Sequence, residues 1–130
     1  MNIGPEAIMQ MQLFDWIRSR PDIEPYAFHI GNERKCTPQQ GSILKRSGVK
    51  AGVWDNFIAI PRNNYHGLFV ELKAGKNKLS DKQITFGDAV GMQMYKCVVA
   101  WSYEDARRAI EDYLAIEKPC DISPSVLYPI

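Results

Sequence analysis

The chain has 130 residues, of which 45% are hydrophobic and 24% charged, a composition typical of one water-soluble globular domain. No apolar run approaches the roughly 18 residues of a membrane-spanning helix, and the N-terminus lacks a basic and then apolar leader, so we expect a cytoplasmic protein with no membrane partner. The formal net charge of +1 does not by itself indicate nucleic-acid binding, and three widely spaced cysteines argue against a disulfide framework or a zinc cluster.

The N-terminal segment predicts a helix with an acidic residue on its buried side. Pro5 suits the first helical position, and the helix should end at about Ser19. Glu6 recurs at the helical period with Leu13 and Ile17, so its carboxylate shares a stripe with core residues. Two interpretations stay open: Glu6 serves the positive end of the helix dipole, or it belongs to a functional site.

A short strand and a second helix follow. Residues 26–30 are predicted to form the strand. Thr37 then suits the N-cap of a helix, with Pro38 in the first position and Gln40 completing a capping box. This helix should end near Gly48 and lead into the centre of the chain.

The centre of the chain predicts a hairpin with charged residues at its ends. Two apolar runs, residues 54–60 and 67–72, are joined by a connector too short for a crossover helix, so they should pair antiparallel. A turn in the middle of the connector puts Asp55 within about one residue of the position opposite Glu71. Glu71 and Lys73 share one face of the second strand.

The C-terminal half predicts two more helices around one strand. A capping box at residues 80–83 begins a helix that ends around Gly91, and residues 102–116 form a last capped helix. Between them, residues 95–101 are apolar almost throughout, which predicts a strand buried on both faces. Cys97 should be buried in this strand.

The order helix, strand, helix, hairpin, helix, strand, helix predicts an α/β fold, a mixed β-sheet flanked by helices on both faces. No internal repeat interrupts this order. We place the globular domain at residues 1–116. Residues 117–130 contain three prolines and no hydrophobic period, so we treat them as a C-terminal tail or a segment that binds across a partner.

The facing carboxylates of the hairpin carry the functional argument. They repel each other, and partial burial strengthens the repulsion. Lys73 offsets part of it, and a bound divalent cation would offset more, because hard cations favour carboxylate and carbonyl oxygens. His29 and His66 are isolated, so zinc is disfavoured relative to Mg²⁺ or Mn²⁺. Such a metal activates water and a nearby lysine stabilises charge on a phosphate, which suits phosphodiester hydrolysis.

Asp55, Glu71 and Lys73 form a motif in which an aspartate is followed, after a spacer, by Glu-x-Lys. This motif resembles that of the PD-(D/E)xK nucleases. The sequence around this motif resembles the VRR-NUC family, and in particular its small stand-alone phage and bacterial members. It consists of SGVKAGVWD, an apolar run and HGLFVELKAGKNKLSDKQ. The resemblance covers roughly residues 3–114 and implies a restriction-endonuclease-like core for the domain at residues 1–116. Trp54 departs from the family pattern, which usually has proline there.

The resemblance implies a role for each residue of the motif. Asp55 and Glu71 would coordinate Mg²⁺ or Mn²⁺, with the backbone carbonyl of Leu72 as a third ligand. Lys73 would act at the attacking water or at the phosphate.

Two further residues match the family's site. Gln83 matches a glutamine next to the active site, although the capping box is a sufficient explanation by itself. Glu6 matches the acid of the first helix, which would line the site or contact a second metal.

Stand-alone members of the family resemble Holliday-junction resolvases and are expected to act as homodimers, since a symmetric junction presents two equivalent strands. We therefore expect a metal-dependent endonuclease selective for branched DNA such as Holliday junctions. Eight basic residues are candidate contacts to DNA phosphates: Arg34, Lys35, Lys45, Arg46, Lys50, Lys76, Lys78 and Lys82.

Two alternatives stay open. A non-catalytic DNA-binding or assembly subunit could keep the nuclease fold, and Trp54 is the one sequence feature in its favour. A nuclease acting on RNA or on linear duplex ends would keep the chemistry and change the substrate. Metal titration separates the first alternative from an enzyme, and a panel of substrates separates the second.

Overall fold

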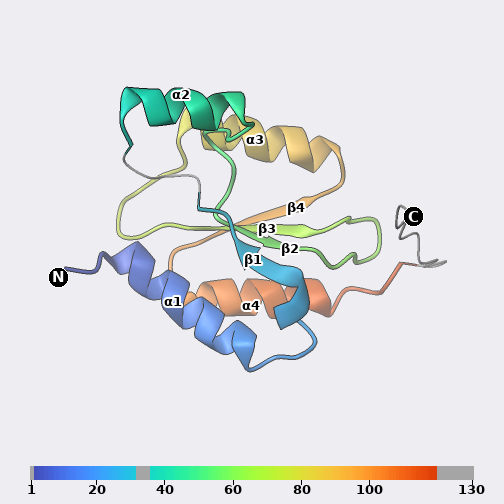
Figure 1. The fold of residues 1–130 in the computed structure, drawn as a ribbon. Coiled ribbons are helices and arrows are strands. Elements are labelled where there is room, and N and C mark those ends of the chain that lie inside the picture. Colours follow the sequence, from blue (N-terminus) through green and yellow to red (C-terminus); the bar gives the residue numbers. More distant parts are fainter. Residues whose placement is uncertain (1, 32–35, 120–130) are drawn as a thin grey trace, which may run out of the picture.

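The structure is a computed structural model that describes residues 2–31 and 36–119. Its strands form one four-stranded sheet in the order β1-β2-β3-β4, with helices on both faces (Figure 1). This arrangement confirms the predicted α/β fold with a mixed sheet. In chain order the elements are α1 (Pro5–Arg18), the 3₁₀ turn η1 (Glu24–Tyr26), β1 (Ala27–His29), α2 (Pro38–Arg46), β2 (Asn56–Ile58), β3 (Leu68–Leu72), α3 (Asp81–Met92), β4 (Lys96–Ala100) and α4 (Tyr103–Leu114).

The strand pairing brings the two ends of the predicted hairpin together. β2 pairs antiparallel with β1 and β3, whereas β3 and β4 pair parallel, with α3 as the crossover helix between them. In the β2–β3 hairpin Asn56 lies opposite Val70. Continuing that register by one residue puts Asp55 opposite Glu71, within one residue of the register predicted from the connector.

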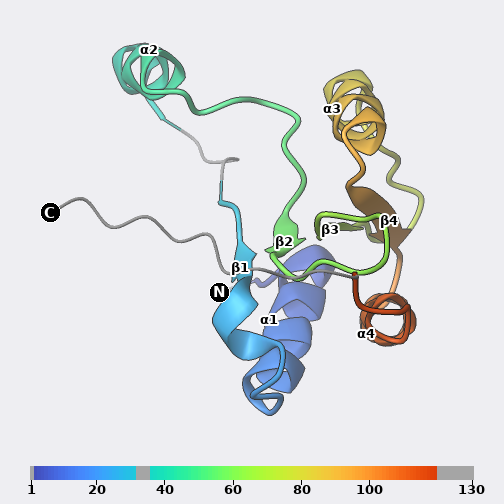
Figure 2. The same ribbon diagram turned by 90° about the vertical axis from the view of Figure 1, so that its right-hand side faces the viewer.

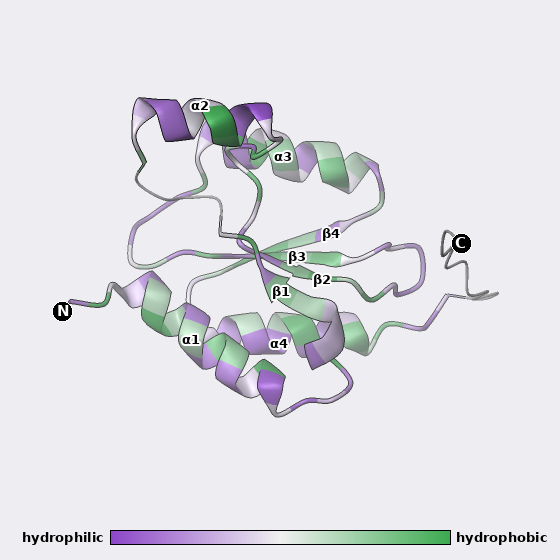
Figure 3. Cartoon of the chain, in the orientation of Figure 1, coloured by the Kyte–Doolittle hydropathy of each residue, from purple (hydrophilic) through white to green (hydrophobic). Residues whose placement is uncertain are grey.

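The main core lies between the sheet and the helices α1 and α4. Leu13 and Ile17 of α1 are buried, as their helical spacing predicts, and they belong to one cluster with Ile110 of α4. Alternate residues of β3, Leu68 and Val70, complete this layer from the sheet side. Figure 3 shows that the helices also carry hydrophilic residues, which suits their outer surfaces.

The opposite face of the sheet carries aromatic side chains. The rings of Phe57 and Phe69 have centroids 4.6 Å apart, and Phe86 of α3 meets Phe69 edge-on at 5.2 Å. Helix α3 thus covers this face. Helix α2 has no buried residue and stands apart from the sheet and from α3 (Figure 2).

Strand β4 differs from the prediction in its burial. It is an edge strand of the described sheet, where Ala100 is its one buried residue and Lys96 is exposed. An apolar run does not reveal whether a strand has neighbours on both sides, which is why the pattern overstated burial. Cys97 is accordingly half-buried rather than buried, yet burial still raises the pKa of its thiol to about 11.

The C-terminal boundary stays a prediction. Helix α4 ends at Leu114, close to the predicted domain end at residue 116. Most of the predicted tail, residues 117–130, lies outside the described residues. Within residues 2–31 and 36–119, no helix is both long and apolar enough to cross a membrane.

Candidate active site

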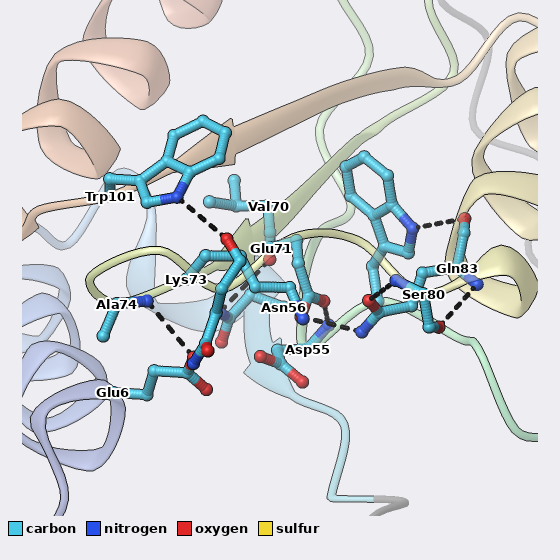
Figure 4. A network of polar contacts seen from close by, with 12 residues as sticks. Glu6, Asp55, Asn56, Val70, Glu71, Lys73, Ala74, Ser80, Gln83 and Trp101 are labelled. Carbon is cyan, nitrogen blue, oxygen red and sulfur yellow. Dashed lines mark hydrogen bonds and ion pairs between the residues drawn. The ribbon is translucent and has the colours of Figure 1, made fainter.

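Asp55 and Glu71 meet at the end of the β2–β3 hairpin. Asp55 directly precedes β2, and Glu71 is the fourth residue of β3. The Asp55 backbone N–H donates to Glu71 Oε1 over 3.0 Å (Figure 4). Glu71 is only 2% exposed, whereas Asp55 is partly exposed. The structure therefore brings the two predicted acids together and buries one of them.

Burial and charge both oppose ionisation of Glu71. Loss of hydration and, after it, the negative charge of Asp55 raise the pKa of Glu71 to about 7. The Asp55 N–H and the ammonium of Lys73, whose Nζ lies 3.5 Å from Glu71 Oε2, act in the opposite direction. A buried acid with a strongly perturbed pKa beside a second acid is typical of a functional site.

Gln83 links helix α3 to the acid pair. Its backbone N–H and its Oε1 form the predicted capping box with Ser80. The nitrogen of the same side-chain amide, Nε2, donates to Glu71 Oε2 over 3.0 Å. The two interpretations of Gln83, helix cap and neighbour of the site, therefore describe two contacts of one side chain.

Trp54 packs against helix α3. Its indole Nε1 donates to the Gln83 backbone carbonyl over 2.9 Å, and the residue is 4% exposed. Gly87, one turn further along α3, makes room for the ring, because a Cβ at this position would lie 2.9 Å from Trp54 Cζ2. Tryptophan in place of the usual proline thus anchors α3 while Asp55 stays beside Glu71.

Glu6 lies at the edge of this site and holds the loop that follows Lys73. Its Oε1 accepts hydrogen bonds from the Ala74 backbone N–H over 3.2 Å and from Asn77 Nδ2 over 3.0 Å. Glu6 and Asp55 also line one hollow of about 440 Å³. Because both hydrogen-bond partners belong to a distant segment, the helix dipole alone does not explain this carboxylate.

Three residues near the acids were not identified from the sequence. His29, interpreted as isolated, donates from Nδ1 to the Asp55 backbone carbonyl over 2.9 Å and lines the same hollow. Gln10 and Asn56 exchange two side-chain hydrogen bonds of 2.7 and 3.0 Å. The alternation of the strand could have indicated that Asn56 is buried, but its partner on α1 depends on tertiary packing.

The candidate phosphate contacts fall into separate groups. Three of them line a hollow of about 610 Å³ shared by α2, the loop after it and α3: Lys45, Lys50 and Lys82. Three others are exposed and do not line that hollow: Arg46, Lys76 and Lys78. Two lie outside the described residues: Arg34 and Lys35.

The donor atoms of the acid pair fit a hard divalent cation. Asp55 and Glu71 supply carboxylate oxygens, and the carbonyl of Leu72 follows directly in the chain. In the described part of the chain, no three His, Cys, Asp or Glu side chains form a metal-binding group. A cation at this position would therefore complete its coordination with backbone, solvent or substrate oxygens, which suits Mg²⁺ or Mn²⁺ better than zinc.

Comparison with known proteins identifies the fold. No family model and no curated protein matches the chain. A solved structure described as "VRR_NUC domain protein" is similar to it, with 25% sequence identity and a TM-score of 0.77, over 96% of this chain and 100% of that one. This likeness over nearly the whole of both chains supports an assignment to the VRR-NUC family. The VRR-NUC resemblance and the restriction-endonuclease-like core predicted from the sequence are thereby confirmed.

The likeness to a VRR_NUC domain supports a relationship to a family of nuclease domains. Within this VRR-NUC fold, the hairpin and the first turn of α3 together position Asp55, Glu71, Lys73 and Gln83. The metal, the substrate and the oligomeric state stay predictions.

Proposed function

We propose that this VRR-NUC domain is a Mg²⁺- or Mn²⁺-dependent endonuclease that hydrolyses phosphodiester bonds in DNA. The contact between Asp55 and the buried Glu71, with Lys73 at the same carboxylate, carries the proposal. Burying one carboxylate beside another costs free energy in the absence of a ligand, so the acid pair does not serve to stabilise the fold. Binding of a cation between the two carboxylates would explain why they lie together.

The residues present can hold the cation and act on the phosphate. Asp55, Glu71 and the Leu72 carbonyl would bind it. When bound, the cation would polarise the scissile phosphate and favour formation of a nucleophile from water near neutral pH. Lys73, largely buried beside Glu71, would donate to the phosphate or to the attacking water.

Gln83 and Glu6 would act around this centre. Gln83 Nε2 holds the Glu71 carboxylate and so orients a metal ligand. Glu6 holds the loop of residues 74–79 and faces the hollow that it shares with Asp55, where it would line the substrate path or meet a second metal.

We propose branched DNA, such as a Holliday junction, as the substrate and a homodimer as the active form. The lysines around the hollow between α2 and α3 support a phosphate-binding surface, and phosphate contacts recognise the shape of DNA rather than its sequence. A two-fold dimer would present two such sites to the two equivalent strands of a junction.

Cleavage assays test this proposal. Purified protein is incubated with four-way, flapped, linear duplex and single-stranded DNA and with RNA, in Mg²⁺, Mn²⁺ or EDTA. We expect metal-dependent cleavage of branched DNA that Asp55→Ala and Lys73→Ala abolish while the far-ultraviolet circular dichroism stays unchanged. Asp112→Ala, which removes an exposed acid of α4, is the matched control and should cleave normally.

The same assays can contradict the proposal. A folded wild-type protein that cleaves no substrate with either metal would do so. Tight DNA binding without a cation site at Asp55 and Glu71 would instead favour the non-catalytic subunit.

A further inference from the structure

Trp101 is a large side chain exposed beside the proposed site. It follows the last residue of β4 and is 50% exposed. The carbonyl of its neighbour Ala100 accepts a hydrogen bond from the Lys73 backbone N–H over 2.9 Å. The parallel register pairs Leu72 with Ala100, so its continuation puts Trp101 next to Lys73.

The loop that carries two candidate phosphate contacts holds the indole in place. Trp101 Nε1 donates to the Asn77 backbone carbonyl over 3.3 Å, and Asn77 Nδ2 donates to Glu6 (Figure 4). Lys76 and Lys78 flank Asn77 and are exposed. The polar atom of the ring is therefore bonded inside the protein, while half of the residue remains open to solvent.

The rings of the other two tryptophans, unlike that of Trp101, pack against other parts of the protein. Trp54 is buried against α3. Trp16 packs on the core and lies near the guanidinium groups of Arg20 and Arg107. Among residues 2–31 and 36–119, no aromatic ring or cation stacks on Trp101. Its exposed face is available to a planar group from outside the chain.

We propose that Trp101 stacks on an unpaired base next to the scissile phosphate. This inference rests on the proposed nuclease function, in which Lys73 donates to the scissile phosphate or to the attacking water. A base inside a continuous duplex is already stacked on both sides, whereas a base at a branch point, flap or gap has a free face. Among branched DNAs, those with unpaired nucleotides at the cleavage position, such as flaps and gaps, are therefore favoured over a fully paired four-way junction.

Binding measurements test the stacking separately from cleavage. With Ca²⁺ in place of Mg²⁺, the Kd is measured for branched DNA with unpaired nucleotides, for single-stranded DNA and for a fully paired duplex. Trp101→Ala should weaken binding to the first two by about 5- to 150-fold, the effect of losing one aromatic–base stack, and leave duplex binding within about twofold. Trp101→Phe, which keeps a ring, should restore most of the affinity.

Tyr26 offers a matched control. It is also 50% exposed, but it lies in η1, and the Tyr26→Ala variant should bind every DNA as the wild type does. A change of the same size in Tyr26→Ala would show that any exposed aromatic ring contributes and would overturn a specific role for Trp101.

An abasic scan pairs the protein change with a DNA change. Single abasic nucleotides are placed in turn along the unpaired strand. At the stacking position, loss of the base should weaken binding by the wild type and have no further effect on Trp101→Ala, because the two changes remove the same contact. DNA should also quench tryptophan fluorescence in the wild type more strongly than in Trp101→Phe.

Several results would overturn the inference. These are unchanged affinity of Trp101→Ala, an equal loss for duplex and unpaired DNA, or additive effects at every abasic position. If the wild type binds and cleaves DNA in those cases, the nuclease function stands and the stacking role alone fails. A wild type that neither binds nor cleaves any DNA contradicts both.

Discussion

Gln83 donates from Nε2 to Glu71 Oε2 over 3.0 Å while its Oε1 accepts from the Ser80 backbone N–H over 2.9 Å. One side chain thus caps helix α3 and holds a buried carboxylate. Because the two contacts use opposite ends of the amide group, substitutions can separate them.

Replacing Gln83 should show both contacts. Gln83→Ala removes the acceptor for the Ser80 backbone N–H, which is half of the capping box, and a donor to a buried acid, so we expect the free energy of unfolding to fall by about 1–3 kcal/mol in denaturant titrations. Gln83→Glu keeps an acceptor for Ser80 but puts a third carboxylate beside Glu71. Mg²⁺ should therefore raise the Tm of Gln83→Glu more than that of Gln83→Ala, and equal responses would argue against a cation at Glu71.

Two glycines of α3 provide a matched test of how Trp54 packs. In Gly87→Ala the new methyl would lie 2.9 Å from Trp54 Cζ2, so we expect a loss of about 1–3 kcal/mol from overpacking. Gly91→Ala adds its methyl in open space on the same helix and should stabilise the protein by about 0.5–1 kcal/mol. Thermal denaturation of both variants checks this, and a neutral Gly87→Ala would contradict the close contact.

Asp55→Asn should separate stability from cation binding. It removes the charge that opposes ionisation of Glu71, so the metal-free variant should gain about 0.5–2 kcal/mol of stability. The same variant should lose the increase in Tm that Mg²⁺ gives the wild type, because a ligand is gone. Asp88→Asn, at an exposed position of α3, should change neither property. An Asp55→Asn protein that still responds to Mg²⁺ would rule out Asp55 as a ligand.

The metal-free protein should lose stability as the pH rises towards neutrality. The pKa of Glu71 is about 7 in the folded protein against an ordinary value of 4.5, so between these values the folded state holds a proton that the unfolded chain has released. The contribution of Glu71 is therefore most favourable below pH 4.5 and declines until about pH 7.

Unfolding in EDTA between pH 4 and pH 8 measures this effect. Glu71→Gln cannot titrate at this position. As the pH rises to about 7, the wild type should therefore become steadily less stable relative to Glu71→Gln, and above pH 7 the difference in the free energy of unfolding should stay constant. A difference that does not depend on pH would show that Glu71 keeps an ordinary pKa.

The helix starts could be predicted because each depends on neighbouring residues. Thr37, Ser80 and Ser102 are N-caps in the structure, and each cap involves only a few consecutive residues. The hairpin register followed for a similar reason, since a short connector leaves little freedom in how β2 and β3 align. This is why Asp55 and Glu71 could be placed together from the sequence.

Contacts between distant segments could not be predicted. Gln10 and Asn56 are 46 residues apart, and Glu6 and Asn77 are 71 apart, so no local pattern joins them. The space that Gly87 leaves for Trp54 is visible only once α3 lies against the segment that precedes β2. The edge position of β4 likewise depends on the order of strands in the sheet, which the apolar run of residues 95–101 does not encode.

The parallel pairing of β3 with β4 also determines when the site can form during synthesis. The Lys73 N–H needs the Ala100 carbonyl, and Glu6 reaches Ala74 across 68 residues. A chain that leaves the ribosome N-terminus first has released Asp55 and Glu71 well before β4 can close the edge of β3. We therefore expect the proposed active site to stay incomplete in a nascent domain until Ala100 has emerged from the ribosome.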